Sequence, residues 1–183
     1  MTTQEEQQIK QQLSDPKTQR KAFERIVREY SEPLYWHVRR IVLTHDNAND
    51  VMQNVFLKAW THLDDFHGES KISSWLYRIA TNESIDFIRR NKNKITNGSD
   101  DVQSGIANML IADTYFDGNE TEALLQEVIS RLPDVQRTVF NMRYYDDMKY
   151  SEISKILKTS EGALKASYHI AVKKISEYLK LFD

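Results

Sequence analysis

The stretch Tyr150-Ser-Glu-Ile-Ser-Lys-Ile-Leu-Lys-Thr-Ser-Glu-Gly-Ala-Leu-Lys-Ala-Ser-Tyr-His-Ile-Ala-Val-Lys-Lys-Ile175 has the pattern of two short helices joined by a tight turn. Apolar residues recur three or four positions apart on both sides of Lys158-Thr159-Ser160, so each half predicts an amphipathic helix. Ser160 is well placed to cap the second helix, because its hydroxyl can accept a hydrogen bond from an unpaired backbone N–H. The stretch therefore predicts a helix-turn-helix. Its apolar stripes contain Ile153, Ile156 and Leu157, then Leu164, Tyr168, Ala171, Val172 and Ile175.

The face of the second helix opposite its apolar stripe is small, polar and basic, which suits a DNA major groove. In helix-turn-helix proteins the second helix lies among the base edges while flanking cations meet phosphates. An ordinary helical hairpin with a solvated lysine face would give the same pattern, and this alternative stays open here. The candidate DNA-binding residues are Ser160, Gly162, Lys165, Ala166, His169, Lys173 and Lys174.

Composition favours a helical protein without a disulfide framework. The 183 residues allow one domain or two small ones, and the absence of cysteine fits a reducing compartment. Five glycines and three prolines leave few tight turns, so helices should dominate. The N-terminus is polar, and no apolar run is long enough to span a bilayer. These features predict a cytoplasmic protein that is not inserted in a membrane.

The net charge of -2 conceals a strong asymmetry along the chain. Residues 71–94 and 149–180 are basic, whereas residues 45–70 and 95–148 are acidic. Basic blocks that are separated by acidic ones can bind nucleic acid even when the total charge is slightly negative.

Helical periodicity divides the chain into two domains. We expect an all-α protein with a helical domain at 1–95, a flexible acidic linker at 96–120 and a helix-turn-helix domain at 121–183. The start of the chain reads as frayed, Pro33 is expected to open a helix, and Asp46 is expected to cap the next one. The apolar and aromatic residues of the linker could bind to a partner. These residues are Ile106, Met109, Leu110, Ile111, Tyr115 and Phe116.

Aromatic and cationic residues are interleaved between Ser70 and Arg90, which is typical of proteins that bind single-stranded DNA. Asn82 lies well inside the helix, where an amide has low helix propensity, and it could read the edge of an extruded base. Trp75 is left open between base stacking and a place in the core. The contacts expected are Lys71, Trp75, Tyr77, Arg78, Asn82, Arg89 and Arg90.

Asp50, Gln53, Asn54 and Leu57 are predicted to lie on one side of a helix, away from Val51, Val55 and Ala59. A mixed polar and apolar strip suits a helix-on-helix contact with another protein, although a solvated face would look similar.

No catalytic, metal or cofactor site emerges. The sequence has no glycine-rich phosphate loop, no histidine pair at metal-binding spacing and no recognisable nucleophile. The paired carboxylates lie beside turn signals, where Asp is favoured for local hydrogen bonding. We therefore expect a protein that is not an enzyme and needs no cofactor.

Taken in order, these stretches resemble bacterial RNA polymerase sigma factors of the extracytoplasmic-function (ECF) group. Residues 50–56 are similar to the family's polymerase-clamp helix, and residues 73–90 are similar to its promoter-melting segment. Residues 132–140 and 152–165 resemble its C-terminal domain. Asn54 stands where the family usually has an acidic residue, and Ser167, Ile170 and Val172 stand where it is commonly arginine-rich.

The resemblance implies a factor that directs core RNA polymerase to promoters and assists strand opening. It also implies three partners: core RNA polymerase, promoter DNA and an anti-sigma factor. The implied polymerase contacts are Asp50, Gln53, Asn54, Phe56 and Leu57, and Asp86 joins the residues of the melting segment. Two other classes remain as alternatives: a helical protein-interaction adaptor, and a helix-turn-helix regulator that acts without binding polymerase.

Overall fold

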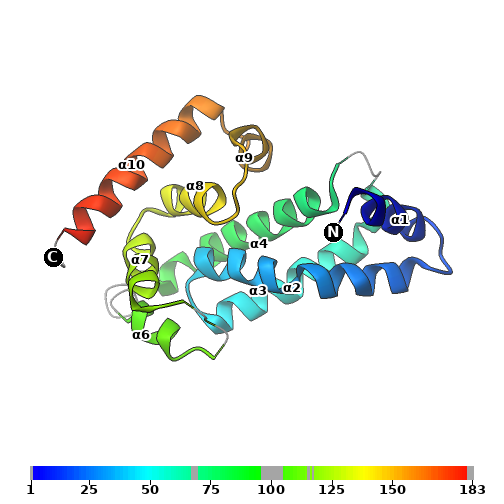
Figure 1. Cartoon of the computed structure of the whole chain (residues 1–183), viewed down its shortest axis with the longest axis horizontal. Helices are drawn as coiled ribbons and strands as arrows, with labels where there is room; N and C mark the ends of the chain where they lie inside the picture. The colour runs from blue at the N-terminus through cyan, green and yellow to red at the C-terminus, as the bar shows by residue number, and fades with distance from the viewer. Residues whose placement is uncertain (1, 67–69, 96–104, 115, 117, 181–183) are drawn as a thin grey trace. The chain divides into compact units, whose positions relative to one another are not determined.

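The computed structural model describes residues 2–66, 70–114, 116 and 118–180, except 96–104, and the side chains of 92–95 are outside the description. Within these residues the chain forms helices joined by short connections, without a β-strand, which confirms the all-α prediction. Figure 1 shows the helices in chain order. They are α1 (Thr3–Leu13), α2 (Gln19–Val42), α3 (His45–Thr61), η1 (Leu63–Asp65), α4 (Ile72–Ile95), α6 (Ile106–Ile111), α7 (Glu120–Ser130), α8 (Asp134–Tyr144), α9 (Tyr150–Leu157) and α10 (Glu161–Leu179).

The chain divides into two compact units. The first comprises residues 1–39 and 44–85, and the second comprises residues 40–43 and 86–183. The predicted limits at 95 and 121 remain a prediction. Part of the predicted linker is helical, because α6 packs on α7 through Ile106 and Leu110 and its Ala107 N–H donates to Glu127 Oε2 at 3.2 Å.

The first unit has a core of aliphatic side chains from α2, α3 and α4. Leu34, Val38, Val55 and Leu76 are all fully buried there. Pro33 lies inside the continuous helix α2, so the prediction that it opens a new helix was wrong. A proline inside a helix costs about 3 kcal/mol, a penalty that burial of the neighbouring α2 residues offsets.

Two further local predictions in the first unit were wrong. The N-terminus is not frayed, since α1 has a capping box in which Thr2 and Glu5 satisfy each other's backbone N–H groups. Thr44, rather than Asp46, caps α3 by accepting from the Asn47 N–H at 3.3 Å. Asp46 instead lies in the first turn of α3, where a carboxylate favours the positive end of the helix dipole.

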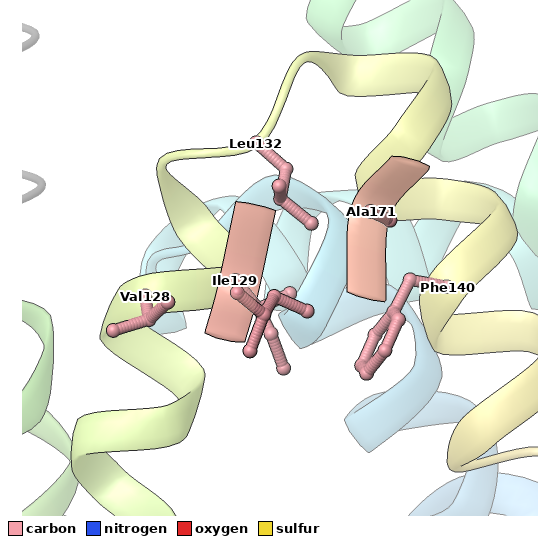
Figure 2. Packing of buried hydrophobic residues seen from close by; sticks show 6 residues of the cluster. Val128, Ile129, Leu132, Phe140 and Ala171 are labelled. Carbon is pink, nitrogen blue, oxygen red and sulfur yellow. The ribbon is translucent and has the colours of Figure 1, made fainter. Parts of the chain in front are cut away.

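The second unit is built around a core that α7, α8 and α10 share. Figure 2 shows Ile129, Leu132 and Phe140 pointing into one apolar space beside Ala171. Arg137 closes the turn between α7 and α8, because its buried guanidinium donates to the carbonyl groups of Ser130 and Leu132 at 3.1 and 3.3 Å. This core holds α10 by one face and leaves its other face in solvent.

The helix-turn-helix forms as predicted. Lys158 ends α9 in a left-handed conformation with φ 52°, and Ser160 caps α10 by accepting from the Ala163 N–H at 3.3 Å. The three-residue turn of Lys158, Thr159 and Ser160 therefore fixes the direction in which α10 leaves α9.

Candidate nucleic-acid interface

The outer face of α10 presents a continuous polar strip. Lys165, His169 and Lys173 follow one another at four-residue intervals and all are exposed, so they lie along one side of the helix. Ser160, Gly162 and Ala166 are also exposed, and nothing lies within 4 Å of a Cβ built on Gly162. Lys174 is half-buried. The structure therefore brings the predicted recognition residues together on a surface that is accessible to DNA.

Part of the predicted apolar stripe of α10 is not in the core. Leu164, Ala171 and Ile175 are buried and Tyr168 is half-buried, but Val172 is 41% exposed. The helix turns by 100° per residue, so Val172 lies too far round from Ala171 to reach the same core.

Tyr150, at the start of α9, has two cations near its ring. The Arg143 guanidinium carbon lies 5.6 Å from the centre of its ring, and Lys165 Nζ lies 5.7 Å from it. A cation over a tyrosine face is attracted by the ring's quadrupole. The ring therefore links the start of α9 to Lys165, one of the predicted DNA-binding residues of α10, a link that the sequence analysis missed.

The exposed residues of α4 form a second strip. Arg78 and Asn82 are exposed and four residues apart, so they lie on one side of the helix, and Arg89 and Arg90 are exposed further along the same helix. Lys71 is exposed just before the helix, whereas Tyr77 and Asp86 are half-buried. Cations around an amide provide phosphate contacts beside a group that can read a base.

Asp86 interacts with two neighbouring arginines on α4. Its carboxylate pairs with Arg89 at 3.3 Å, and its backbone carbonyl accepts from Arg90 Nε at 3.2 Å. A carboxylate does not attract phosphate, so its local effect is to orient Arg89, while the backbone carbonyl orients Arg90.

Trp75 belongs to the core of the first unit. It is 4% exposed and its ring lies 4.9 Å from that of Phe66, so no free face remains for a base. The structure thus contradicts the expectation that Trp75 contacts DNA. Sequence could not decide this, since an indole in an aromatic and cationic segment fits both a stacking platform and a core.

The predicted strip of α3 is accessible as well. Asp50, Gln53, Asn54 and Leu57 are exposed, and Leu57 retains 61% of its surface. Phe56 is half-buried, so only part of its ring is available to a partner. Val51, Val55 and Ala59 are buried on the opposite side and hold the strip outward.

The exposed strip of α3 is also anchored to α4. Lys58 of α3 forms an ion pair with Glu83 of α4, whose side chain is almost completely buried. Glu83 is the buried member of the pair, so losing Lys58 would leave a carboxylate in the interior without its cation, which is costly. The pair therefore links α3 to the part of α4 that lies in the first unit.

Comparison with known proteins matches both parts of the chain. Residues 26–94 match the family "Sigma-70 region 2", and residues 122–175 match "Sigma-70, region 4". The ECF RNA polymerase sigma factor SigW of Bacillus subtilis (strain 168) is 32% identical over 156 residues, which are 81% of this chain and 83% of that protein. The chain belongs to the ECF group of RNA polymerase sigma factors.

Solved structures with the same fold include two that are complexes. CnrH in complex with the cytosolic domain of CnrY has a TM-score of 0.70 at 20% identity, covering 98% of this sigma factor and 99% of that chain. The sigma factor RpoE of Bartonella quintana, in complex with the anti-sigma factor NepR, has a TM-score of 0.69 at 20% identity, covering 87% and 98%. At this identity the likeness shows the fold alone.

The sigma factor's α1 makes contacts that the sequence analysis missed. Glu6 Oε1 accepts from the Ile72 N–H at 2.8 Å, and Lys10 Nζ donates to the Ser70 carbonyl at 2.8 Å. The four-residue spacing of Glu6 and Lys10 shows that they share a helix face, but nothing in the sequence indicates that this face meets the start of α4.

The sigma factor shows no feature of a metal site or a membrane span in its described parts. No group of three or more His, Asp or Glu side chains is placed there to hold a metal ion. No described helix combines the length and the hydropathy needed to cross a bilayer.

Proposed function

We propose that this sigma factor directs core RNA polymerase to specific promoters and assists strand opening there. The observation that carries the proposal is the presence, in one chain that matches both sigma regions, of three exposed strips with different chemistry. The strip on α3 suits protein, the strip on α4 suits unpaired DNA, and the strip on α10 suits a duplex groove. An adaptor or a simple repressor would not need the strip on α4 that suits unpaired DNA.

In this proposal α3 binds core polymerase. Leu57 offers an exposed apolar side chain between the polar groups of Asp50, Gln53 and Asn54. Buried apolar anchors supply most of the affinity of such contacts, while polar neighbours fix their register.

The α4 strip is proposed to hold the opened strand. Arg78, Arg89, Arg90 and Lys71 are placed to neutralise phosphates, and the Asn82 amide offers donors and an acceptor to an extruded base. Tyr77 offers only the part of its ring that the core leaves uncovered. Trp75 takes no part in this contact.

The α10 strip is proposed to read the upstream promoter element. Lys165 lies near the helix N-terminus, where base contacts are usual, and an ammonium there can donate to guanine O6 or N7. His169 reaches a base or a phosphate, and Lys173 and Lys174 lie further back, where phosphates are nearer.

An anti-sigma factor is proposed as a regulatory partner. The related structures are complexes with the cytosolic domain of CnrY and with the anti-sigma factor NepR. Exposed apolar side chains on α3 and α6 support such a contact here, because Leu57, Met109 and Ile111 are each more than two-fifths exposed. We also propose that the sigma factor acts in the cytoplasm, since its proposed partners are core polymerase and promoter DNA.

Run-off transcription with core polymerase tests the proposal. Core enzyme with and without the sigma factor is incubated with a library of double-stranded templates, and the transcripts are sequenced. Initiation at a shared motif is expected only when the sigma factor is present. The absence of any sigma-dependent start sites across the library would refute the proposed function.

A further inference from the structure

We propose that Glu6 and Lys10 of α1 are positioning residues for strand opening. Both side chains belong to another helix, and they hold the backbone at the start of α4 in place. The inference rests on the proposed role of α4 and adds residues that touch neither DNA nor polymerase in that role. Glu6 and Lys10 lie about sixty positions before the segment they hold, in a part of the chain that reads as a polar tail.

Helix α4 lacks an acidic residue of its own in its first turn. The first N–H groups of a helix have no partner within the helix, and a carboxylate nearby also complements the positive end of the dipole. Glu6 Oε1 supplies that carboxylate to the Ile72 N–H at 2.8 Å. Ile72 is fully buried, so losing Glu6 would leave a donor that water reaches poorly.

Lys10 holds Ser70, which lies just before the start of α4. Its Nζ donates to the Ser70 carbonyl at 2.8 Å, lies 3.5 Å from Glu6 Oε1 and lies 5.7 Å from the centre of the Phe66 ring. Phe66 in turn packs on Trp75 in the second turn of α4. One face of α1 therefore contacts residues on both sides of the point where α4 begins.

Lys71 lies between the two anchored residues. Ser70 is held through its carbonyl and Ile72 through its N–H, so the backbone of Lys71 is fixed on both sides while its side chain stays exposed. Because α4 is continuous from Ile72, the same anchors set the direction in which Arg78 and Asn82 are presented. Prior fixation of these groups reduces the entropy lost on binding a strand.

The neighbouring Glu5 provides a matched control. Glu5 caps α1 itself, with its carboxylate accepting from the Thr2 N–H at 2.7 Å, and does not contact α4 in the described structure. Glu5→Ala and Glu6→Ala remove the same charge and the same atoms at adjacent positions. Only the second removes the acceptor for Ile72.

The test uses the full chain with core polymerase and a duplex template that the wild-type factor transcribes in the library experiment. Permanganate reactivity of unpaired thymines measures the open fraction, and a titration against core enzyme measures assembly. Glu6→Ala is expected to lower the open complex equilibrium roughly fivefold, in line with the loss of a helix cap. Glu5→Ala should leave it unchanged, and core binding should be equal for all variants.

Two further measurements separate positioning from general stability. Glu6→Gln keeps an oxygen that accepts from Ile72 N–H, so its open fraction should return to within about twofold of wild type. Hydrogen exchange of the Ile72 amide should accelerate in Glu6→Ala and not in Glu5→Ala. If Glu6→Ala does not fold, Lys10→Gln replaces it, with the same expected loss of opening.

The results distinguish this inference from the function on which it rests. If the wild-type factor opens no template, both are overturned. If wild type opens the template and Glu6→Ala or its substitute equals wild type, only the positioning role is overturned. Equal losses in Glu5→Ala and Glu6→Ala would also overturn it, because they would reflect the stability of α1 alone.

Discussion

His37 Nε2 on α2 lies 2.9 Å from Thr81 Oγ1 on α4, and both side chains are fully buried. The single hydroxyl hydrogen of Thr81 is directed to the Tyr77 carbonyl at 2.7 Å, so the oxygen accepts from His37 Nε2–H. The same imidazole meets the Tyr77 ring edge-on at 5.0 Å. Two helices of the first unit are thus joined by one directional hydrogen bond directly beneath the α4 strip.

Thr81→Val should destabilise the first unit more than its small change in shape suggests. It keeps the side-chain volume but leaves His37 Nε2–H without an acceptor, a loss of about 1–3 kcal/mol. Thr81→Ser keeps the hydroxyl and removes one methyl, which costs about 1 kcal/mol. Urea unfolding of both variants measures the difference, and a serine variant less stable than the valine variant would contradict the assigned hydrogen bond.

Replacing Asp50 and Gln53 by Ala should weaken binding to core polymerase without unfolding the protein, because both side chains are exposed on α3. Losing a charged interface hydrogen bond costs roughly 2–5 kcal/mol. Titration against core enzyme measures the effect. Glu24→Ala removes an exposed acid from α2 as a control for charge, and unchanged affinity in the double variant would remove these residues from the interface.

Asn82→Ala should impair strand opening and leave duplex binding through α10 intact. Alanine is the better helix former, so the variant should be at least as stable as wild type. Permanganate reactivity should fall at one or two thymines next to the extruded base. Asn108→Ala removes an exposed amide from α6 as a control, and equal reactivity in all three proteins would refute the role of Asn82.

Lys165→Ala and Lys173→Ala should have different effects on promoter binding by the holoenzyme. Loss of a base contact at Lys165 should cost about 1–3 kcal/mol and relax preference at one base position. Loss of a phosphate contact at Lys173 should weaken all promoters similarly and lower the salt slope by about one. Affinities for matched and mismatched promoters at several salt concentrations test this. Unchanged affinity in both variants would mean that these lysines form only a solvated face.

Tyr145 gives the second unit a pH dependence in the alkaline range. Burial raises the pKa of Tyr145 from 10.0 to about 12. Its stabilising effect is therefore fully present below pH 10 and is lost as the pH rises through about 12, since the unfolded chain releases the proton first. Unfolding of wild type should become easier across that interval, and Tyr145→Phe should lack this additional loss. Tyr144→Phe, at an exposed neighbour, should behave as wild type.

The sequence alone determined the elements whose signals are local. The helix-turn-helix was predictable because its apolar spacing, its interruption at Lys158 and its cap at Ser160 all lie within one short stretch. The exposed strips of α3 and α10 followed from helical periodicity in the same way. The resemblance to sigma factors then joined these stretches into one function.

Only the tertiary structure decided what depends on residues far apart in the chain. Trp75 is core rather than a stacking platform because Phe66 covers it, and Pro33 stays inside α2 because buried neighbours offset its cost. The N-terminal helix holds the start of α4 because Glu6 accepts a hydrogen bond from the N–H of Ile72, sixty-six positions later. Periodicity shows which face of a helix is apolar or polar, whereas only packing determines which distant backbone group that face satisfies.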